Sequence, residues 1–328
     1  MSRPLVLLAA LLATAAAPAP FYHVAGSIAG PDGSWDYARV DAATNRLYVA
    51  RSNAVTAVDL ASGTVTSFGE IQRGHAVVPL SGGRLLVTSG TDGTVRFFDK
   101  DGKQIGSVPV GNRPDAAVLD ASGAHAFVMN AGGGTVSEID TATMKVSRTI
   151  TVKPALEFAA VAGNMLYIND EDANEIEVID IAKGTTGTPI ALTGCEGPSG
   201  LGYDAKHGRL ISACANGKAA IVDAKAGKLA ALVDIGKGPD AVIVDEARGF
   251  AFIPCGRDGV LEILSLASPA AVTKVGQVTT EAGARTGALD PKTGAIYLPT
   301  AKTAAPAQPG GRPAPVPGSF HLVVVKPG

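Results

Sequence analysis

Thr135-Val136-Ser137-Glu138-Ile139-Asp140 is one copy of a short apolar segment that recurs along the chain and decides the fold. Thr94-Val95-Arg96-Phe97-Phe98-Asp99 and Glu175-Ile176-Glu177-Val178-Ile179-Asp180 have the same pattern. The final residues of six copies are 40, 41, 40, 43 and 42 residues apart: Asp59, Asp99, Asp140, Asp180, Asp223 and Ser265. A period near 42 is typical of a propeller blade or a solenoid unit.

A turn residue precedes each copy. Six positions before each final residue stand Asn53, Gly93, Gly134, Asn174, Gly217 and Gly259. Glycine and asparagine tolerate a positive φ, which tight hairpin turns require. We therefore expect a hairpin with a positive φ before every copy.

A seventh copy, Gly318–Val324, ends 59 residues after Ser265, which is 17 more than the period of 42. The Pro- and Ala-rich segment 303–319 is 17 residues long, so we interpret it as a loop insertion in the last repeat. Only four residues follow Val324, whereas Tyr22–Ile28 is a spare strand before the first repeat. The N-terminal strand should therefore complete the last blade and close the ring.

Each repeat contains four short apolar segments separated by polar turns, for example 115–119, 125–130, 135–140 and 145–151. Four strands per repeat are typical of a propeller blade. The turns leave no room for the helices that a parallel α/β fold needs. The sequence thus predicts an all-β, seven-bladed β-propeller with four-stranded blades, one domain over residues 20–328.

The composition is that of a globular protein: 46% of the residues are hydrophobic, 18% are charged and the formal net charge is −2. This excludes disorder, and it gives no basic patch for nucleic acid. Arg3 and the apolar run 5–17, followed by small residues and Pro, are typical of a secretory signal peptide, assigned to residues 1–19. We expect a periplasmic or secreted monomer without a membrane span in the mature chain.

The third repeat resembles a known family. Gly111-Asn112-Arg113-Pro114-Asp115, Phe127-Val128-Met129-Asn130 and Thr135–Asp140 followed by Thr141-Ala142-Thr143 are similar to the repeat of the YncE-like, or YVTN, propellers. The resemblance implies an exported bacterial propeller and a scaffold. This family shares its architecture with lactonases and with quinoprotein or haem-linked dehydrogenase subunits, so the resemblance does not imply one chemistry.

Candidate ligand-binding residues come from one position of the repeat, five residues before the end of each first strand. This polar ring consists of Asp36, His75, Asp115, Glu157, Ser199, Asp240 and Arg285. One interpretation is that these residues only cap turns. The other is that they bind a ligand at the channel mouth. Because four carboxylates repel one another, the second interpretation favours a divalent cation, a cationic or hydroxyl-rich ligand, or a basic partner loop.

Two classes of function remain. The first is a non-enzymatic propeller that binds a periplasmic protein or a small molecule. The second is a lactonase-like hydrolase or a quinoprotein-type oxidoreductase accessory subunit. The chain has no Cys-x-x-Cys-His motif for covalent haem and no phosphate-binding loop. Asp170–Asn174 resembles a calcium loop, but Glu175 replaces the required glycine. We assign no catalytic residue and favour the binding protein.

The three cysteines are an odd number, and in an exported protein thiols usually pair. Cys195 precedes the first strand of the fifth blade, and Cys214 ends its second strand, so antiparallel pairing brings them together. Cys214 and Cys255 occupy matching places in adjacent blades and form the competing pair. We predict the Cys195–Cys214 disulfide.

Overall fold

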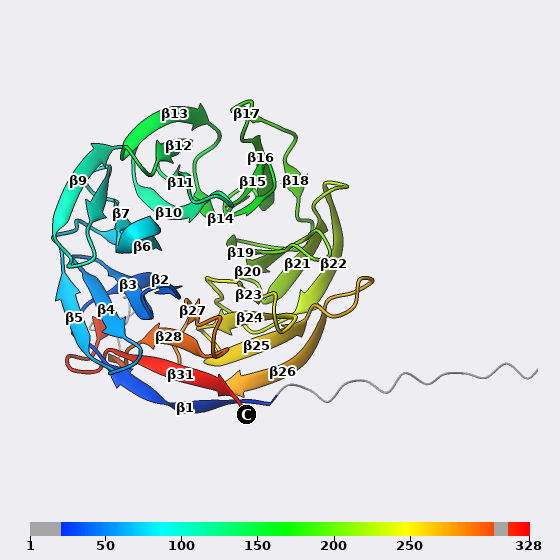
Figure 1. Cartoon of the computed structure of the whole chain (residues 1–328). Coiled ribbons are helices and arrows are strands. Elements are labelled where there is room, and N and C mark those ends of the chain that lie inside the picture. Colours follow the sequence, from blue (N-terminus) through cyan, green and yellow to red (C-terminus); the bar gives the residue numbers. More distant parts are fainter. Residues whose placement is uncertain (1–20, 305–313) are drawn as a thin grey trace, which may run out of the picture.

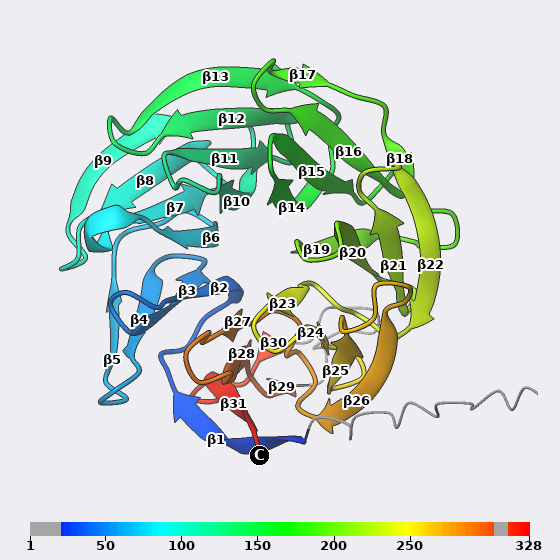
Figure 2. The same ribbon diagram turned by 45° about the vertical axis from the view of Figure 1, so that its right-hand side comes forward.

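Seven antiparallel sheets surround one axis in the computed structural model, which describes residues 21–304 and 314–328 (Figure 1). The predicted all-β, seven-bladed propeller is confirmed. The chain passes round the ring once, and within each blade it runs from the axis outward (Figure 2).

The first four blades follow one another along the chain. Blade 1 contains β2 (Trp35–Asp41), β3 (Arg46–Arg51), β4 (Val55–Asp59) and β5 (Val65–Phe68). Blade 2 contains β6 (Gly74–Pro79), β7 (Leu85–Ser89), β8 (Thr94–Phe98) and β9 (Gln104–Pro109), with the short 3₁₀-helix η1 (Ser81–Gly83) between β6 and β7. Blade 3 contains β10 (Pro114–Leu119), β11 (His125–Asn130), β12 (Thr135–Asp140) and β13 (Lys145–Thr151). In blade 4, β14 (Leu156–Ala162), β15 (Met165–Asp170) and β16 (Glu175–Asp180) are followed by a split outer strand, β17 (Thr185–Thr186) and β18 (Ile190–Ala191).

The remaining blades close the ring. Blade 5 contains β19 (Pro198–Asp204), β20 (Arg209–Cys214), β21 (Lys218–Asp223) and β22 (Lys228–Asp234). Blade 6 contains β23 (Ile243–Asp245), β24 (Phe250–Cys255), β25 (Val260–Ser265) and β26 (Thr273–Thr279). Blade 7 contains β27 (Ala288–Leu289), β28 (Ile296–Thr300), β31 (His321–Pro327) and β1 (Tyr22–Ala29).

The N-terminal strand β1 is the outermost strand of blade 7, as the sequence predicts. It pairs antiparallel with β31, from Tyr22 opposite Pro327 to Ala29 opposite His321. Figure 1 shows the two strands next to each other along the lower edge of the ring. The first and last described strands therefore hold the same blade together.

Small residues allow the blades to converge at the axis. The middle strands of each blade are buried on both faces, as in β11 and β15, whereas outer strands such as β13 alternate between exposed and buried positions. In the innermost strand β19, a Cβ atom on Gly200 would lie 2.5 Å from the carbonyl carbon of Ala241. Glycine at this position therefore lets β19 lie close to the backbone of the next blade near the axis.

The turns before the recurring segment follow the prediction with one exception. Gly93, Gly134, Gly217 and Gly259 have φ values of 65°, 63°, 82° and 63°, and Asn174 has 54°. Asn53 is not among the residues with a positive φ, so the prediction is wrong there. Blade 1 makes this turn differently: the N–H of Arg51 donates to the carbonyl of Ala54.

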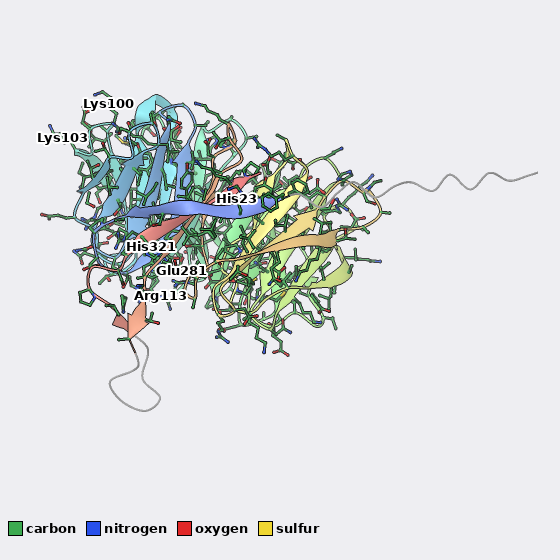
Figure 3. All side chains as sticks on the ribbon, turned by 90° about the horizontal axis from the view of Figure 1, so that it is seen from below. His23, Lys100, Lys103, Arg113, Glu281 and His321 are labelled. Atoms are coloured by element: carbon green, nitrogen blue, oxygen red, sulfur yellow. A yellow bond between two sulfur atoms is a disulfide. The ribbon has the colours of Figure 1, made fainter. Side chains whose placement is uncertain are left out.

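The insertion in blade 7 begins and ends with a small antiparallel ribbon of β29 (Thr303–Ala304) and β30 (Ala314–Pro315). It projects from the face towards which Arg113 and Glu281 lie, and Lys100 and Lys103 lie towards the opposite face (Figure 3). The expected signal peptide and most of the insertion lie outside the described residues. Among the described residues, no helix is long and apolar enough to cross a membrane.

Cys195 and Cys214 form a disulfide in the structure, with a Cα–Cα distance of 5.4 Å, and Cys255 is buried and unpaired. Cys195 lies in the loop before β19, and Cys214 is the last residue of β20. Burial raises the pKa of the Cys255 thiol to about 12, so this residue is a poor nucleophile.

Reduction of the disulfide should destabilise the protein. The bond closes a loop with a sequence separation of 19 residues, and loop entropy predicts a loss of about 3 kcal/mol in the free energy of unfolding. Urea unfolding with and without reductant measures the loss. The Cys255→Ala variant, which keeps the disulfide, should lose the same free energy of unfolding when it is reduced. A linked peptide containing Cys255 in non-reducing mass mapping would contradict the pairing.

Candidate functional site

A β-bulge positions the polar-ring residue in five of the blades. In blade 1, Trp35 pairs with Arg51 and Ala38 with Val49, so two residues, Asp36 and Tyr37, lie opposite one. The same shift occurs in β6, β10, β14 and β19, at His75, Asp115, Glu157 and Ser199. A bulge bends the strand and redirects a side chain. The repeat therefore brings equivalent side chains to equivalent places round the axis.

A left-handed residue stands two positions before six members of the polar ring. The φ values are 62° at Arg73, 53° at Arg113, 63° at Ala155, 59° at Gly197, 69° at Gly238 and 92° at Gly283. In blade 2 the carbonyl oxygen of Arg73 accepts a hydrogen bond from the N–H of Gly90, which follows β7, and blades 3 to 6 make the equivalent bond. This recurring link fixes the entry of each first strand against the end of the second.

The residue after the second strand, whose N–H donates this hydrogen bond, is small in most blades, because the polar-ring side chain passes close to it. A Cβ atom on Gly90 would lie 3.3 Å from Nε2 of His75, and one on Gly256 would lie 2.7 Å from Cβ of Arg285. The equivalent residues are Ser52, Ala131, Ala215 and Ala301. Glu171 is the exception and adds another carboxylate to the mouth.

Three members of the polar ring form a compact cluster of metal-binding groups. Nδ1 of His75 lies 2.6 Å from Oδ2 of Asp36 and 3.7 Å from Oδ2 of Asp115. Ligand atoms of the three residues all lie within 4.8 Å of one another. A separation of 2.6 Å requires a proton between the two atoms, so Nδ1–H of His75 donates to Asp36. Three consecutive blades thus supply one nitrogen and two carboxylates.

The carboxylates of the ring do not cap turns. Asp41 accepts a hydrogen bond from the N–H of Ala43, and Asp120 accepts one from the N–H of His125, as turn caps do. Asp115 is 9% exposed, and in the described part of the chain its carboxylate accepts no hydrogen bond. Its nearest charged partner is Nδ1 of His75 at 3.7 Å, so the turn-capping interpretation does not explain this buried group.

Burial and mutual repulsion raise the pKa values of the ring carboxyls. Burial raises the pKa of Glu157 to about 10, and the charges of Asp115 and Asp240 contribute. Burial also raises the pKa of Asp115 to about 7, where His75 opposes the rise and Asp36 adds to it. The pKa of Asp240 is about 6, because burial and Asp36 raise it while Arg285 lowers it. These carboxyls therefore share one electrostatic environment.

His75 and Tyr37 respond to the same charges. Burial alone would lower the pKa of His75, but the hydrogen bond that it donates to Asp36 and the charge of Asp115 raise that pKa above its usual value. Burial raises the pKa of Tyr37 well above 10, and four carboxylates of the mouth add to the rise. Tyr37 packs edge-on against Phe158, with ring centroids 4.9 Å apart, beneath the polar ring.

The other side of the mouth contains an open cavity of about 310 Å³. Ser199, Asp240 and Arg285 of the polar ring line it, together with Glu171 and Arg257. Nε of Arg285 donates to Oδ2 of Asp240 at 2.8 Å, and Oγ of Ser199 donates to the carbonyl oxygen of Pro239 at 2.9 Å. The ring thus has a metal-binding side in blades 1 to 3 and a cavity in blades 4 to 7.

A second acidic cluster lies at the end of blade 4, where Asp170, Glu175 and Glu177 approach one another. Nζ of Lys153 forms ion pairs with Glu175 and, at 2.9 Å, with Glu177. The ammonium group of Lys153 therefore lies beside the carboxylates that a calcium ion at the loop Asp170–Asn174 would use.

Sequence reasoning missed Tyr37, Glu171 and Arg257. Tyr37 follows a ring residue directly, so the same alignment of repeats could have found it. Glu171 stands where the other blades have small residues, which is also a visible signal. Arg257 stands where blade 7 has Lys302 and the other blades have no basic residue, and only the structure places it in the cavity.

No family model matches the chain, and no curated protein matches it. Solved structures do: hydrazine synthase of Kuenenia stuttgartiensis is 18% identical with a TM-score of 0.69, covering 84% of this chain and 94% of that chain. A chain of the mitotic checkpoint complex is 15% identical with a TM-score of 0.75, covering 99% and 98%. At these identities the likeness shows the propeller fold alone.

Proposed function

We propose that this chain is an exported, non-enzymatic binding propeller whose channel mouth binds a divalent cation through Asp36, His75 and Asp115. The observation that carries the proposal is the convergence of these three side chains, whose ligand atoms lie within 4.8 Å of one another. They come from three blades, so the closed ring holds them in place before a cation arrives. A preorganised site of this kind loses little entropy on binding.

The donor set favours a transition metal. Calcium and magnesium take oxygen ligands, whereas imidazole together with carboxylates suits Zn²⁺ and Mn²⁺. The two carboxylates supply the negative charge, and buried Asp115, which has only a long 3.7 Å contact with Nδ1 of His75, gains a closer partner in the cation. A divalent cation also relieves the repulsion among the ring carboxylates.

Export and family membership belong to the same proposal. The disulfide between Cys195 and Cys214 is consistent with an oxidising compartment, and so is the signal-like segment before residue 20. The YncE-like resemblance of the third repeat supports an exported scaffold. The ribbon of β29 and β30 rises on the face of the mouth and gives a partner protein a further surface to contact.

Titration calorimetry with Zn²⁺ and Mn²⁺ on the purified mature chain tests the cation site. We expect binding of one cation per chain, with an affinity that falls at least 100-fold in Asp36→Asn and in His75→Gln, because each loses a direct ligand. His125→Gln is the matched control: His125 is the first residue of β11, at the end of that strand remote from the polar ring, where Nδ1 lies 3.2 Å from Oδ2 of Asp120, so the variant should leave the affinity unchanged. Equal binding by wild type and both ring variants would refute the site.

A further inference from the structure

We infer that the cavity beside the cation site binds the anionic group, a carboxylate or a phosphate, of a small ligand that also coordinates the cation. The inference rests on the proposed cation site and adds the chemical class of its ligand. It starts from two arginines, Arg257 and Arg285, which line the cavity and which the cation site does not use.

Both arginines have guanidinium nitrogen atoms without a hydrogen-bond partner among the described residues. Arg285 uses Nε for its bond to Asp240, and in the described residues its two terminal nitrogens have no partner. Arg257 is exposed and forms no ion pair or side-chain hydrogen bond with any described residue. A guanidinium group binds carboxylate or phosphate through two parallel N–H groups, so these free nitrogens fit an anion.

Glycines hold the two arginines against the cavity wall. A Cβ atom on Gly256 would lie 2.7 Å from Cβ of Arg285, and one on Gly238 would lie 2.5 Å from Cγ of Arg257. Only glycine lets the stems of the arginines lie so close to the neighbouring backbone. The stems are therefore positioned before a ligand arrives.

The cavity and the cation site share one mouth. Oγ1 of Thr286, the residue after Arg285, donates a hydrogen bond to the carbonyl oxygen of Asp36 at 2.9 Å, and the N–H of Asp240 donates to the carbonyl oxygen of Arg285 at 3.1 Å. The three protein ligands leave coordination positions of a bound cation open. A ligand with one anionic group on the cation and another on the arginines would bridge the two sides of the ring.

The charges that line the cavity require the cation to bind before the anion. Glu171 and Asp240 offset Arg257 and Arg285, so the cavity by itself has no excess of positive charge. A bound divalent cation supplies that excess. We therefore expect anions to bind the cation-loaded protein and not the cation-free protein. A volume of about 310 Å³ fits a small metabolite.

Calorimetry on the Mn²⁺-loaded mature chain tests the inference with succinate and with glycerol 3-phosphate as probes, and with succinamide as the neutral counterpart. At least one anion should bind, at least tenfold more tightly with Mn²⁺ than without it, and succinamide should not. Arg257→Gln should weaken the anion at least tenfold while Mn²⁺ affinity stays unchanged. Lys302→Gln removes the same charge from an exposed residue outside the cavity lining, at the position of blade 7 equivalent to Arg257, and should weaken the anion less than twofold.

The possible outcomes are distinct. Binding of succinate alone supports a carboxylate ligand, and binding of glycerol 3-phosphate alone supports a phosphate ligand. If Mn²⁺ binds but neither anion does, or if Arg257→Gln and Lys302→Gln behave alike, the inference is overturned and the cation site stands. If Mn²⁺ itself does not bind the wild-type chain, the proposed function fails and the inference with it.

Discussion

Deletion of residues 21–29 should lower the melting temperature of the mature chain by about 10 °C or more, because it removes the strand that closes the ring. Tyr22 of β1 is 7% exposed and packs against Phe252, with ring centroids 4.9 Å apart. Loss of one such buried aromatic side chain alone costs about 3 to 5 kcal/mol. In a chain of this size, each kcal/mol lowers the melting temperature by about 2 to 4 °C.

Two point variants separate packing from strand pairing. Tyr22→Ala should lose most of the packing energy, whereas Tyr22→Phe should melt at or slightly above the wild-type temperature, because the buried Tyr22 hydroxyl has no hydrogen-bond partner in the described part of the structure. Calorimetric or circular dichroism melting measures all three variants. An unchanged melting temperature in the deletion variant would show that blade 7 is stable without β1.

The cation-free protein should lose stability as the pH rises from 5 to 8, and Glu157→Gln should remove much of this loss. The raised pKa of Glu157, about 10, means that the folded chain holds a proton there which the unfolded chain, near 4.5, has released. Each such proton lowers the free energy of unfolding by about 1.4 kcal/mol per pH unit. Since water reaches the mouth, we expect Glu157→Gln to be more stable than wild type by roughly 2 kcal/mol at pH 8.

The other shifted groups act in the same direction. Asp115 and Asp240, with pKa values of about 7 and 6, and His75, whose pKa is raised, also hold protons more firmly when folded. Their stabilising contribution is complete below the unfolded pKa and is lost as the pH rises through the folded pKa. Asp59 and Asp140 have lowered pKa values and titrate below this window.

Urea unfolding at pH 5, 6, 7 and 8 in the presence of a chelator measures the effect, and Glu70→Gln serves as the control. Glu70 is exposed, and its carboxylate forms no bond with the described residues, so the variant should follow the wild-type pH curve. If Glu157→Gln also follows that curve, Glu157 is charged and well solvated in the folded protein, and the electrostatic account of the mouth is wrong. Saturating Mn²⁺ should flatten the wild-type curve.

The fold was predictable because every blade repeats the same order of short apolar strands and polar turns. Three of the segments assigned in blade 3 agree residue for residue with β11, β12 and β13, since each is bounded by glycine or Asp turns that leave little choice of strand ends. The N-terminal strand could be placed because the last blade is the one repeat that lacks a fourth strand of its own. The positions of Asp36, His75 and Asp115 in one ring follow from the same periodicity.

The geometry within the ring could not be predicted from periodicity. A bulge and a left-handed residue decide where each side chain points, and Arg73, Arg113 and Ala155 adopt positive φ without being glycine or asparagine. Asn53 shows the reverse case, because it is a typical turn residue and yet does not have a positive φ. The pairing of Asp240 with Arg285 and the position of Arg257 depend on contacts between blades, which a single repeat does not encode.

The position of β1 also determines the order of folding. Ala29 pairs with His321, almost the whole length of the chain away, so the segment that leaves the ribosome first finds its partner last. Such long-range closure is slow, because the entropy of a very long loop must be lost before any contact compensates it. We therefore expect six blades to form one by one during synthesis, before the seventh blade is complete. A chain that ends before β31 would therefore leave the edge of an incomplete blade unpaired. Such an edge favours aggregation and proteolysis.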